Sequence, residues 1–230
     1  MTISKTRILS TATCILVVSL LIGCATYKGK PEFKLVNGST RIQKGTIAVI
    51  AGSGSEFDIK LAKEITRELS ENTDLKVFSQ EELSSRMPQY PMYFMKSQES
   101  DTDKWSIQPS YLSEENMKSL QKIQEKLGVE YILLAWTEGA RFWESGITES
   151  CIFSLFMGKK CKMSVPCRVV KYPENRVVAS YNYEDRYYSS TIYTFNQVID
   201  KFLVAASNKI SSQFMAGVLD EDLIINKTQK

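Results

Sequence analysis

A strand, an amphipathic helix and a second strand follow one another in residues 45–79. The run GTIAVIAG is apolar, rich in β-branched residues and bounded by glycines, which is typical of a buried strand. The 18 residues SEFDIKLAKEITRELSEN then carry apolar side chains every four positions, as one face of a helix requires. Ser55, three residues before Asp58, resembles a capping box. LKVFS predicts the second strand. Because a helix joins the two strands, we expect them to be parallel.

The rest of the chain continues this alternation. We expect helices over 79–83, 113–128 and 194–217, a central strand in 129–139, and a hairpin of 167–172 and 176–184 around the turn PEN. Gly128 and Gly217 are predicted to end the last two helices. The order β-α-β-α-β-β-β-α predicts an α/β fold, a single three-layer-like sandwich of a mixed sheet with flanking helices. The domain is expected to span 45–217, followed by a C-terminal tail, 218–230.

The amino-terminal segment, residues 1–23, has the parts of a secretory signal peptide. Lys5 and Arg7 precede an uncharged, mostly apolar run that ends at Gly23. This run is short for a transmembrane helix, which needs about 20 apolar residues. Leu-Ile-Gly-Cys at 21–24 resembles the bacterial lipobox. The resemblance implies that Cys24 becomes the first mature residue and carries a diacylglycerol and a further acyl chain such as palmitate. A plain signal anchor with an incidental cysteine is the alternative.

The lipobox resemblance implies a location in the cell envelope, on a membrane that holds the acyl chains. Ala25 is compatible with sorting to the outer membrane, so we expect an outer-membrane lipoprotein that faces the periplasm. Residues 24–44 mix Lys, Gly, Pro, Asn, Ser and Thr without sustained periodicity. This composition predicts a flexible tether between the lipid and the domain.

The chain contains no histidine. This excludes Ser-His-Asp and Cys-His catalysis and histidine-ligated zinc. Without the signal peptide the net charge is close to zero, so a nucleic-acid partner is not indicated. The three cysteines beyond Cys24 contain no C-x-x-C pair, so neither a zinc ribbon nor a thioredoxin-like site is indicated. We predict no catalytic residue, metal, cofactor or small-molecule substrate.

Residues 146–170 alternate apolar and polar side chains on both sides of the tripeptide GKK. The pattern predicts an extended amphipathic β-hairpin inserted in the domain, with one apolar face. In that register Cys151 lies nearly opposite Cys167, which would allow a cross-strand disulfide. The apolar face could pack on the domain's own core, or it could meet lipid or a neighbouring subunit.

Aromatic residues gather in a long loop, 86–112, and after the last strand. A loop of this length in a compact domain is usually functional or disordered, and its aromatic content argues against disorder. It could pack on its own domain or form a partner surface with the loop after the last strand. The residues proposed for that surface are Tyr90, Tyr93, Phe94, Trp105, Tyr187 and Tyr188.

Two sharper chemical interpretations are open to the sequence. AGSGSEF lies between a strand and a helix start, where backbone N–H groups could hold an anion, but it lacks a dinucleotide or P-loop fingerprint, so a tight turn is favoured. Carboxylates in the second half of the chain could form a glycosidase pair, although nothing in the sequence sets their separation. The candidates are Glu138, Glu144, Glu149, Glu184 and Asp185.

Four stretches in this order resemble one lipoprotein superfamily: GTIAVIAG, LAKEITRELSENTDLKVFSQEEL, LQKIQEKLGVEYILLAWTEGA and CRVVKYPENRVVASYNYE. The superfamily contains the curli-secretion pore protein, the lipoprotein activator of penicillin-binding proteins and the amino-terminal domain of the Tol-Pal periplasmic protein. The resemblance implies a non-catalytic binding, scaffolding or regulatory module whose partner is an envelope protein or a second copy. A subunit of an oligomeric curli-type secretion channel is one alternative, and a cell-wall carbohydrate hydrolase is another.

Overall fold

The computed structural model describes residues 33–88, 90, 112, 114–144, 159–189 and 194–225; for 139–144, 159–160, 186–189 and 195 it describes the backbone alone. The predicted signal peptide and Cys24 lie outside the described residues. In chain order the elements are β1 (Lys34–Leu35), β2 (Thr46–Ala51), α2 (Glu56–Asn72), β3 (Lys76–Phe78), α3 (Gln80–Arg86), α5 (Glu114–Leu127), β4 (Tyr131–Ala135), β5 (Glu138–Glu144), β6 (Lys159–Lys171), β7 (Arg176–Ser189), α6 (Phe195–Val218) and a 3-10 helix (Glu221–Leu223).

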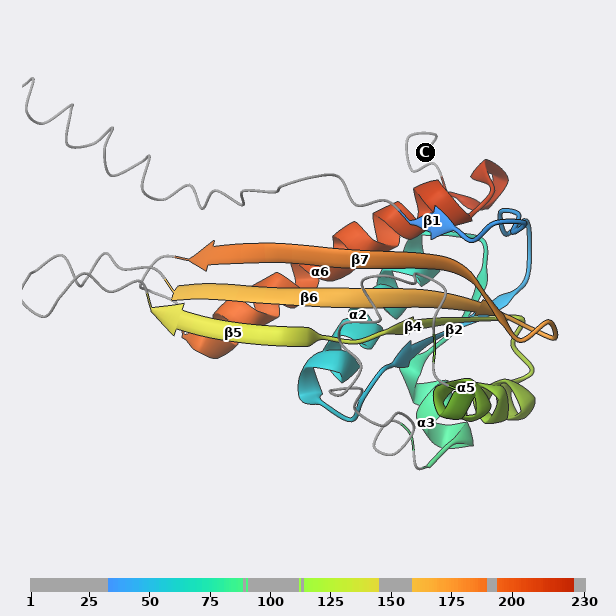
Figure 1. Cartoon of the computed structure of the whole chain (residues 1–230), viewed down its shortest axis with the longest axis horizontal. Coiled ribbons are helices and arrows are strands. Elements are labelled where there is room, and N and C mark those ends of the chain that lie inside the picture. The colour runs from blue at the N-terminus through green and yellow to red at the C-terminus, as the bar shows by residue number, and fades with distance from the viewer. Residues whose placement is uncertain are drawn as a thin grey trace, which may run out of the picture.

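The described strands form one seven-stranded mixed sheet, which confirms the predicted α/β fold (Figure 1). Neighbours follow the order β1-β7-β6-β4-β2-β3, and β5 pairs with β6 beyond the end of β4. β2 is parallel to β3 and to β4, as a helical crossover requires, and the other pairs are antiparallel. Every residue of β4 is buried, so the predicted central strand is confirmed.

Helices α2 and α6 pack on each other and on the sheet, and α3 packs with α5. In Figure 1, α6 crosses behind β6 and β7, while α5 and α3 lie together at the lower right. Within the described ranges, every helix is too short or too polar to cross a bilayer.

Local capping explains where the helices begin. The Ser55 side chain accepts a hydrogen bond from the Asp58 backbone N–H, so the predicted start of α2 is confirmed. Ser79 and Glu82 form a reciprocal capping box at α3. A second box opens α6, where Thr194 and Gln197 exchange bonds in the same way. Each cap satisfies backbone donors that the first helical turn leaves without partners.

The two predicted helix stops have different outcomes. Gly128 follows α5 with φ +66°, a conformation that glycine adopts without strain, so this stop is confirmed. Gly217 lies inside α6, which continues to Val218. A Cβ there would lie 3.1 Å from the Phe33 Cβ, so Gly217 serves a close approach to Phe33 and the predicted stop is wrong.

The structure moves both predicted domain boundaries outward. The tether was expected to run to residue 44, yet Phe33 and Ile42 are buried in the core and β1 pairs with β7. The segment 218–230 was expected to be a tail, yet Leu219 and Leu223 are buried and Ile224 forms a bridge with Thr73. Both predictions are wrong because single apolar residues in polar surroundings carry no periodic signal.

Candidate functional site

Strands β5, β6 and β7 extend beyond the rest of the sheet as a three-stranded ribbon (Figure 1). One of its faces is covered along β6. Cys161, Met163, Val165 and Cys167 alternate along β6 and are 0% exposed. Tyr183 on β7 lies against Phe202 of α6, with ring centroids 6.0 Å apart. The apolar face of this part of the predicted hairpin therefore packs on the chain's own helix.

The opposite face of the ribbon, which we call the outer face, is polar and at least partly open to solvent at Lys162, Ser164, Asn182 and Glu184. Ser164 is partly exposed, and Asn182 is exposed. The Lys162 Nζ lies 2.7 Å from Glu184 Oε1, with 34% and 61% of the two side chains exposed. An ion pair this exposed contributes little stability, so these charges remain accessible to a partner.

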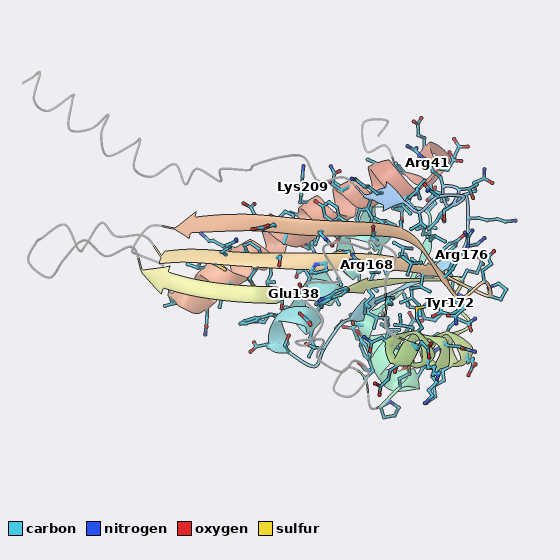
Figure 2. All side chains as sticks on the ribbon, in the orientation of Figure 1. Arg41, Glu138, Arg168, Tyr172, Arg176 and Lys209 are labelled. Carbon is cyan, nitrogen blue, oxygen red and sulfur yellow. The ribbon has the colours of Figure 1, made fainter. Side chains whose placement is uncertain are left out.

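Arg168 belongs to the same face but is 0% exposed. Its Nη1 donates to the Cys167 carbonyl at 2.8 Å and to Asn182 Oδ1 at 3.0 Å. Its guanidinium carbon lies 5.7 Å from the Trp136 ring centroid, in cation-π range. Burial lowers the pKa of Arg168, and the nearby Glu138 carboxylate opposes that change. Figure 2 shows Arg168 and Glu138 near each other on the ribbon.

The polypeptide turns from β4 into β5 at Trp136 and Thr137, a corner held by hydrogen bonds. Trp136 Nε1 donates to Glu138 Oε1 at 2.6 Å. The Thr137 backbone N–H and Oγ1 both donate to Asp58 Oδ1 at 2.7 Å. Ser53 Oγ donates to Asp58 Oδ2 at 2.6 Å. Asp58 is 1% exposed, and its burial raises its pKa while these bonds lower it.

The loop that contains AGSGSEF is held against this corner. The Gly52 N–H donates to the Ala135 carbonyl at 2.8 Å, and a Cβ at Gly52 would lie 2.4 Å from the Trp136 Cβ. The carboxylate of Asp58, in the first turn of α2, would repel an anion at this helix terminus. The observed contacts therefore fit the tight turn and not an anion site.

Each described carboxylate that was proposed for a glycosidase pair forms a hydrogen bond or an ion pair with a neighbouring side chain. Glu138 accepts from Trp136, and Glu184 pairs with Lys162. Asp185 accepts from the Tyr183 hydroxyl at 2.8 Å on the covered face. Only the backbone of Glu144 is described, and Glu149 lies outside the described residues. Among the described residues, no three His, Cys, Asp or Glu side chains are grouped so as to hold a metal.

Tyr90, predicted to be part of a partner surface, is buried, with 7% of the residue exposed. Its hydroxyl accepts from the Ala51 N–H at 3.0 Å and donates to Gln80 Oε1 at 3.0 Å. Burial raises the pKa of Tyr90 to about 12. The prediction is wrong for Tyr90 because β3 pairs only with residues 46–48 of β2, and the Tyr90 side chain supplies the acceptor that Ala51 would otherwise lack.

The other predicted aromatic residues have separate outcomes. Tyr93, Phe94 and Trp105 lie outside the described residues. Tyr187 and Tyr188, predicted in a loop, belong to β7, opposite Cys161 and Lys160. The strand is longer than predicted, so their role at a partner surface stays a prediction.

The predicted hairpin register is wrong. Residues 138–144 pair with 159–164. Cys167 is opposite Ala135 of β4 on one side and opposite Tyr181 of β7 on the other. The Cys167 thiol is free and buried, and Cys151 lies outside the described residues. Burial raises the pKa of both the Cys161 and the Cys167 thiol to about 12. Alternation alone does not choose a partner strand, which explains the error.

Sequence reasoning did not single out Arg168, Trp136 or Thr137. The period-two pattern of KCKMSVPCR places Arg168 with Lys162 and Ser164 on one face, so the face on which Arg168 lies could be predicted from the sequence. The burial of Arg168 could not be predicted, because it depends on Trp136, which is 32 positions away in the sequence and lies against Arg168 only in the folded chain.

No protein-family model and no curated protein matches this chain. Several solved structures resemble it distantly. The PelC dodecamer of Paraburkholderia phytofirmans aligns at 8% identity and TM-score 0.40, over 84% of this chain and 100% of PelC. The lipoprotein GNA1162 of Neisseria meningitidis aligns at 13% identity and TM-score 0.39, over 73% and 98% of the chains. A putative neuraminyllactose-binding hemagglutinin homolog of Helicobacter pylori aligns at 13% identity and TM-score 0.41, over 86% and 91%.

Proposed function

We propose that this chain is a lipid-anchored cell-envelope protein whose domain acts by binding another envelope component and not by catalysis. The observation that carries the proposal is the position of the Leu-Ile-Gly-Cys motif. Cys24 is nine positions before Phe33, the first buried residue of the domain. Nine extended residues reach about 30 Å, roughly the diameter of a small domain. A domain on so short a tether stays close to the membrane that holds the acyl chains.

The contacts of the polar side chains support binding over catalysis. Glu138, Glu184 and Asp185 each have a neighbour that donates to or pairs with the carboxylate. A candidate acid or base in catalysis must be within hydrogen-bond reach of a substrate proton, whereas the described contacts of these carboxylates are to the protein itself. The outer face of the ribbon has the character of a binding surface, because its exposed side chains are polar and it is carried by three paired strands. Ala25 is compatible with the outer membrane, and we propose that the domain lies in the periplasm.

Mass analysis of the protein purified from membranes tests the anchor. We expect the mature chain to begin at Cys24 and to carry the added mass of the acyl chains, and Cys24→Ser to abolish both. Cys14→Ser is the matched control, because Cys14 lies in the segment that cleavage would remove. A wild-type chain that retains residues 1–23, or that lacks acyl mass, would overturn the proposed anchoring.

The binding role is tested by measuring mass and activity of the lipidated chain in detergent. Light scattering should give a monomer or a small assembly, and purified peptidoglycan should remain intact after incubation. A large ring would replace the proposal by the channel alternative. Release of soluble glycan fragments would replace it by the hydrolase alternative.

A further inference from the structure

The register of the ribbon brings cations from three strands into one row. Arg141 of β5 is opposite Lys162 of β6, and Lys162 is opposite Arg186 of β7. Residues directly opposite each other on neighbouring strands occupy the same face of a sheet, so all three belong to the outer face. Neighbouring strands are about 4.8 Å apart. The backbone positions of these three cationic residues therefore lie within about 10 Å of one another.

The next row toward the end of the ribbon adds aromatic residues to this face. There Lys160 of β6 is opposite Trp143 of β5 and Tyr188 of β7. On the other side of the cation row, Ser164 is opposite Glu138 and Glu184. On the outer face, the row with Glu138 and Glu184 thus lies on the domain side of the cation row, and the aromatic row lies on the other side. We call Arg141, Trp143, Lys160, Lys162, Arg186 and Tyr188 the ribbon tip.

Like charges directly opposite each other in a sheet are destabilising. Glu184 compensates Lys162, which it approaches to 2.7 Å. An external anionic partner would offset the remaining repulsion among the cations. Trp and Tyr beside Lys and Arg are the residues that proteins place at the headgroup level of a bilayer. The composition of the ribbon tip therefore fits an anionic lipid surface.

The direction of β1 places the start of the described domain on the side of the ribbon tip. β1 is antiparallel to β7, with Lys34 opposite Ser180, and Figure 1 shows the two arrows pointing in opposite directions. Because β7 runs toward the ribbon tip, β1 runs away from it, so Phe33 lies on the tip side of β1. Phe33 stacks on Tyr181 at 4.7 Å, seven residues before Tyr188 in β7. Seven residues of strand span about 24 Å.

From these observations we propose that the ribbon tip binds the anionic headgroups of the bilayer in which Cys24 is anchored. The tether of nine residues reaches about 30 Å, which exceeds the distance from Phe33 to the tip. Both contacts can therefore form on the same membrane, and the tether keeps the tip at high effective concentration. The geometry rests on the proposed anchoring, whereas headgroup binding by the tip is measurable without any acyl chain. Residues 145–158, which join β5 to β6, lie outside the described residues.

Vesicle flotation of residues 24–230 carrying Cys24→Ser tests the proposal. We expect this unlipidated chain to float with vesicles of phosphatidylglycerol and phosphatidylethanolamine at low salt, and to be released as salt rises. The double variant R141Q/R186Q should bind about 25-fold more weakly, which is about fivefold for each cation near an anionic surface. K44Q/R176Q removes the same charge from exposed residues outside the tip and should bind like the wild type.

The wild-type comparisons of headgroup and salt need no substitution, so they decide the proposal even if R141Q/R186Q fails to fold. Equal flotation with phosphatidylcholine vesicles, or no flotation at low salt, would overturn headgroup binding. An equal loss in K44Q/R176Q would show only a net-charge effect and would overturn the assignment to the tip. Binding to soluble polyglutamate without binding to vesicles would assign the tip to an acidic polymer instead. Absence of acyl chains on Cys24 would overturn the anchoring and leave the flotation result intact.

Discussion

Gly52→Ala should destabilise the domain through a clash at the corner between β4 and β5. The added Cβ would lie 2.4 Å from the Trp136 Cβ, 3.1 Å from its Cγ and 3.2 Å from the Ala135 carbonyl oxygen. Carbon atoms at optimal contact are about 3.5–4.0 Å apart, so the shortfall exceeds 1 Å. The Trp136 Cβ is attached directly to the backbone and cannot rotate away. The backbone on one side must therefore move.

That movement strains the bonds that join the corner to its neighbours. The Gly52 N–H donates to the Ala135 carbonyl at 2.8 Å, and the Trp136 N–H donates to the Pro166 carbonyl at 3.3 Å. Overpacking costs about 1–3 kcal/mol, and each weakened hydrogen bond costs about 1 kcal/mol. We expect the free energy of unfolding, measured by urea denaturation with circular dichroism, to fall by about 3 kcal/mol.

Gly38→Ala is the matched control. Nothing lies within 4 Å of a Cβ at Gly38, so only its φ of +80° opposes alanine, at a cost of about 1 kcal/mol. Trp136→Ala keeps the Cβ and should not relieve the clash, whereas Trp136→Gly should reduce the cost of Gly52→Ala. A loss in Gly52→Ala no larger than that in Gly38→Ala would refute the proposed steric contact.

Three further predictions concern buried polar groups. Cys161 and Cys167 are buried with thiol pKa values of about 12, so a thiol reagent at pH 8 should label both in urea and neither in the native protein; rapid native labelling would contradict their burial. Burial raises the folded-state pKa of Asp58. The contribution of Asp58 to the free energy of unfolding is therefore fully present below the unfolded pKa of about 3.9, and it is lost as pH rises through the folded pKa. D58N should therefore gain stability relative to the wild type as pH rises through that window, and a pH-independent difference would sink this reasoning. Tyr90→Phe should lower the free energy of unfolding by about 1–3 kcal/mol, because the buried Ala51 N–H loses its acceptor; an unchanged urea midpoint would rule out that bond.

Elements with a strong local signal were predictable. The cap at Ser55, the box at Ser79 and the stop at Gly128 depend on groups within a few residues of one another, so their sequence spacing is sufficient. The apolar run of β4 predicted a strand covered on both faces for the same reason. β1 was missed because a two-residue strand has no period, and its pairing depends on β7 more than 140 positions later.

The site was less predictable than the fold. Alternation in β6 correctly separated Lys162 and Ser164 from the buried cysteines, but it did not identify the partner strand. The polar residues of the corner come from two distant segments, and only the folded chain brings Asp58 to Thr137. The same holds for Tyr90. Its aromatic ring was interpreted as part of a partner surface, whereas its hydroxyl accepts a hydrogen bond from the buried strand β2.

Local chemistry in the chain was thus enough to indicate an α/β domain behind a lipobox-like motif and to exclude histidine chemistry. Helix periodicity, caps and motifs are encoded within short windows, where geometry follows directly from residue spacing. Only the tertiary structure decided which face of the ribbon α6 covers and which cations share a row. Those outcomes depend on strand pairing across long separations, and a shift of one residue in register exchanges the two faces of a strand.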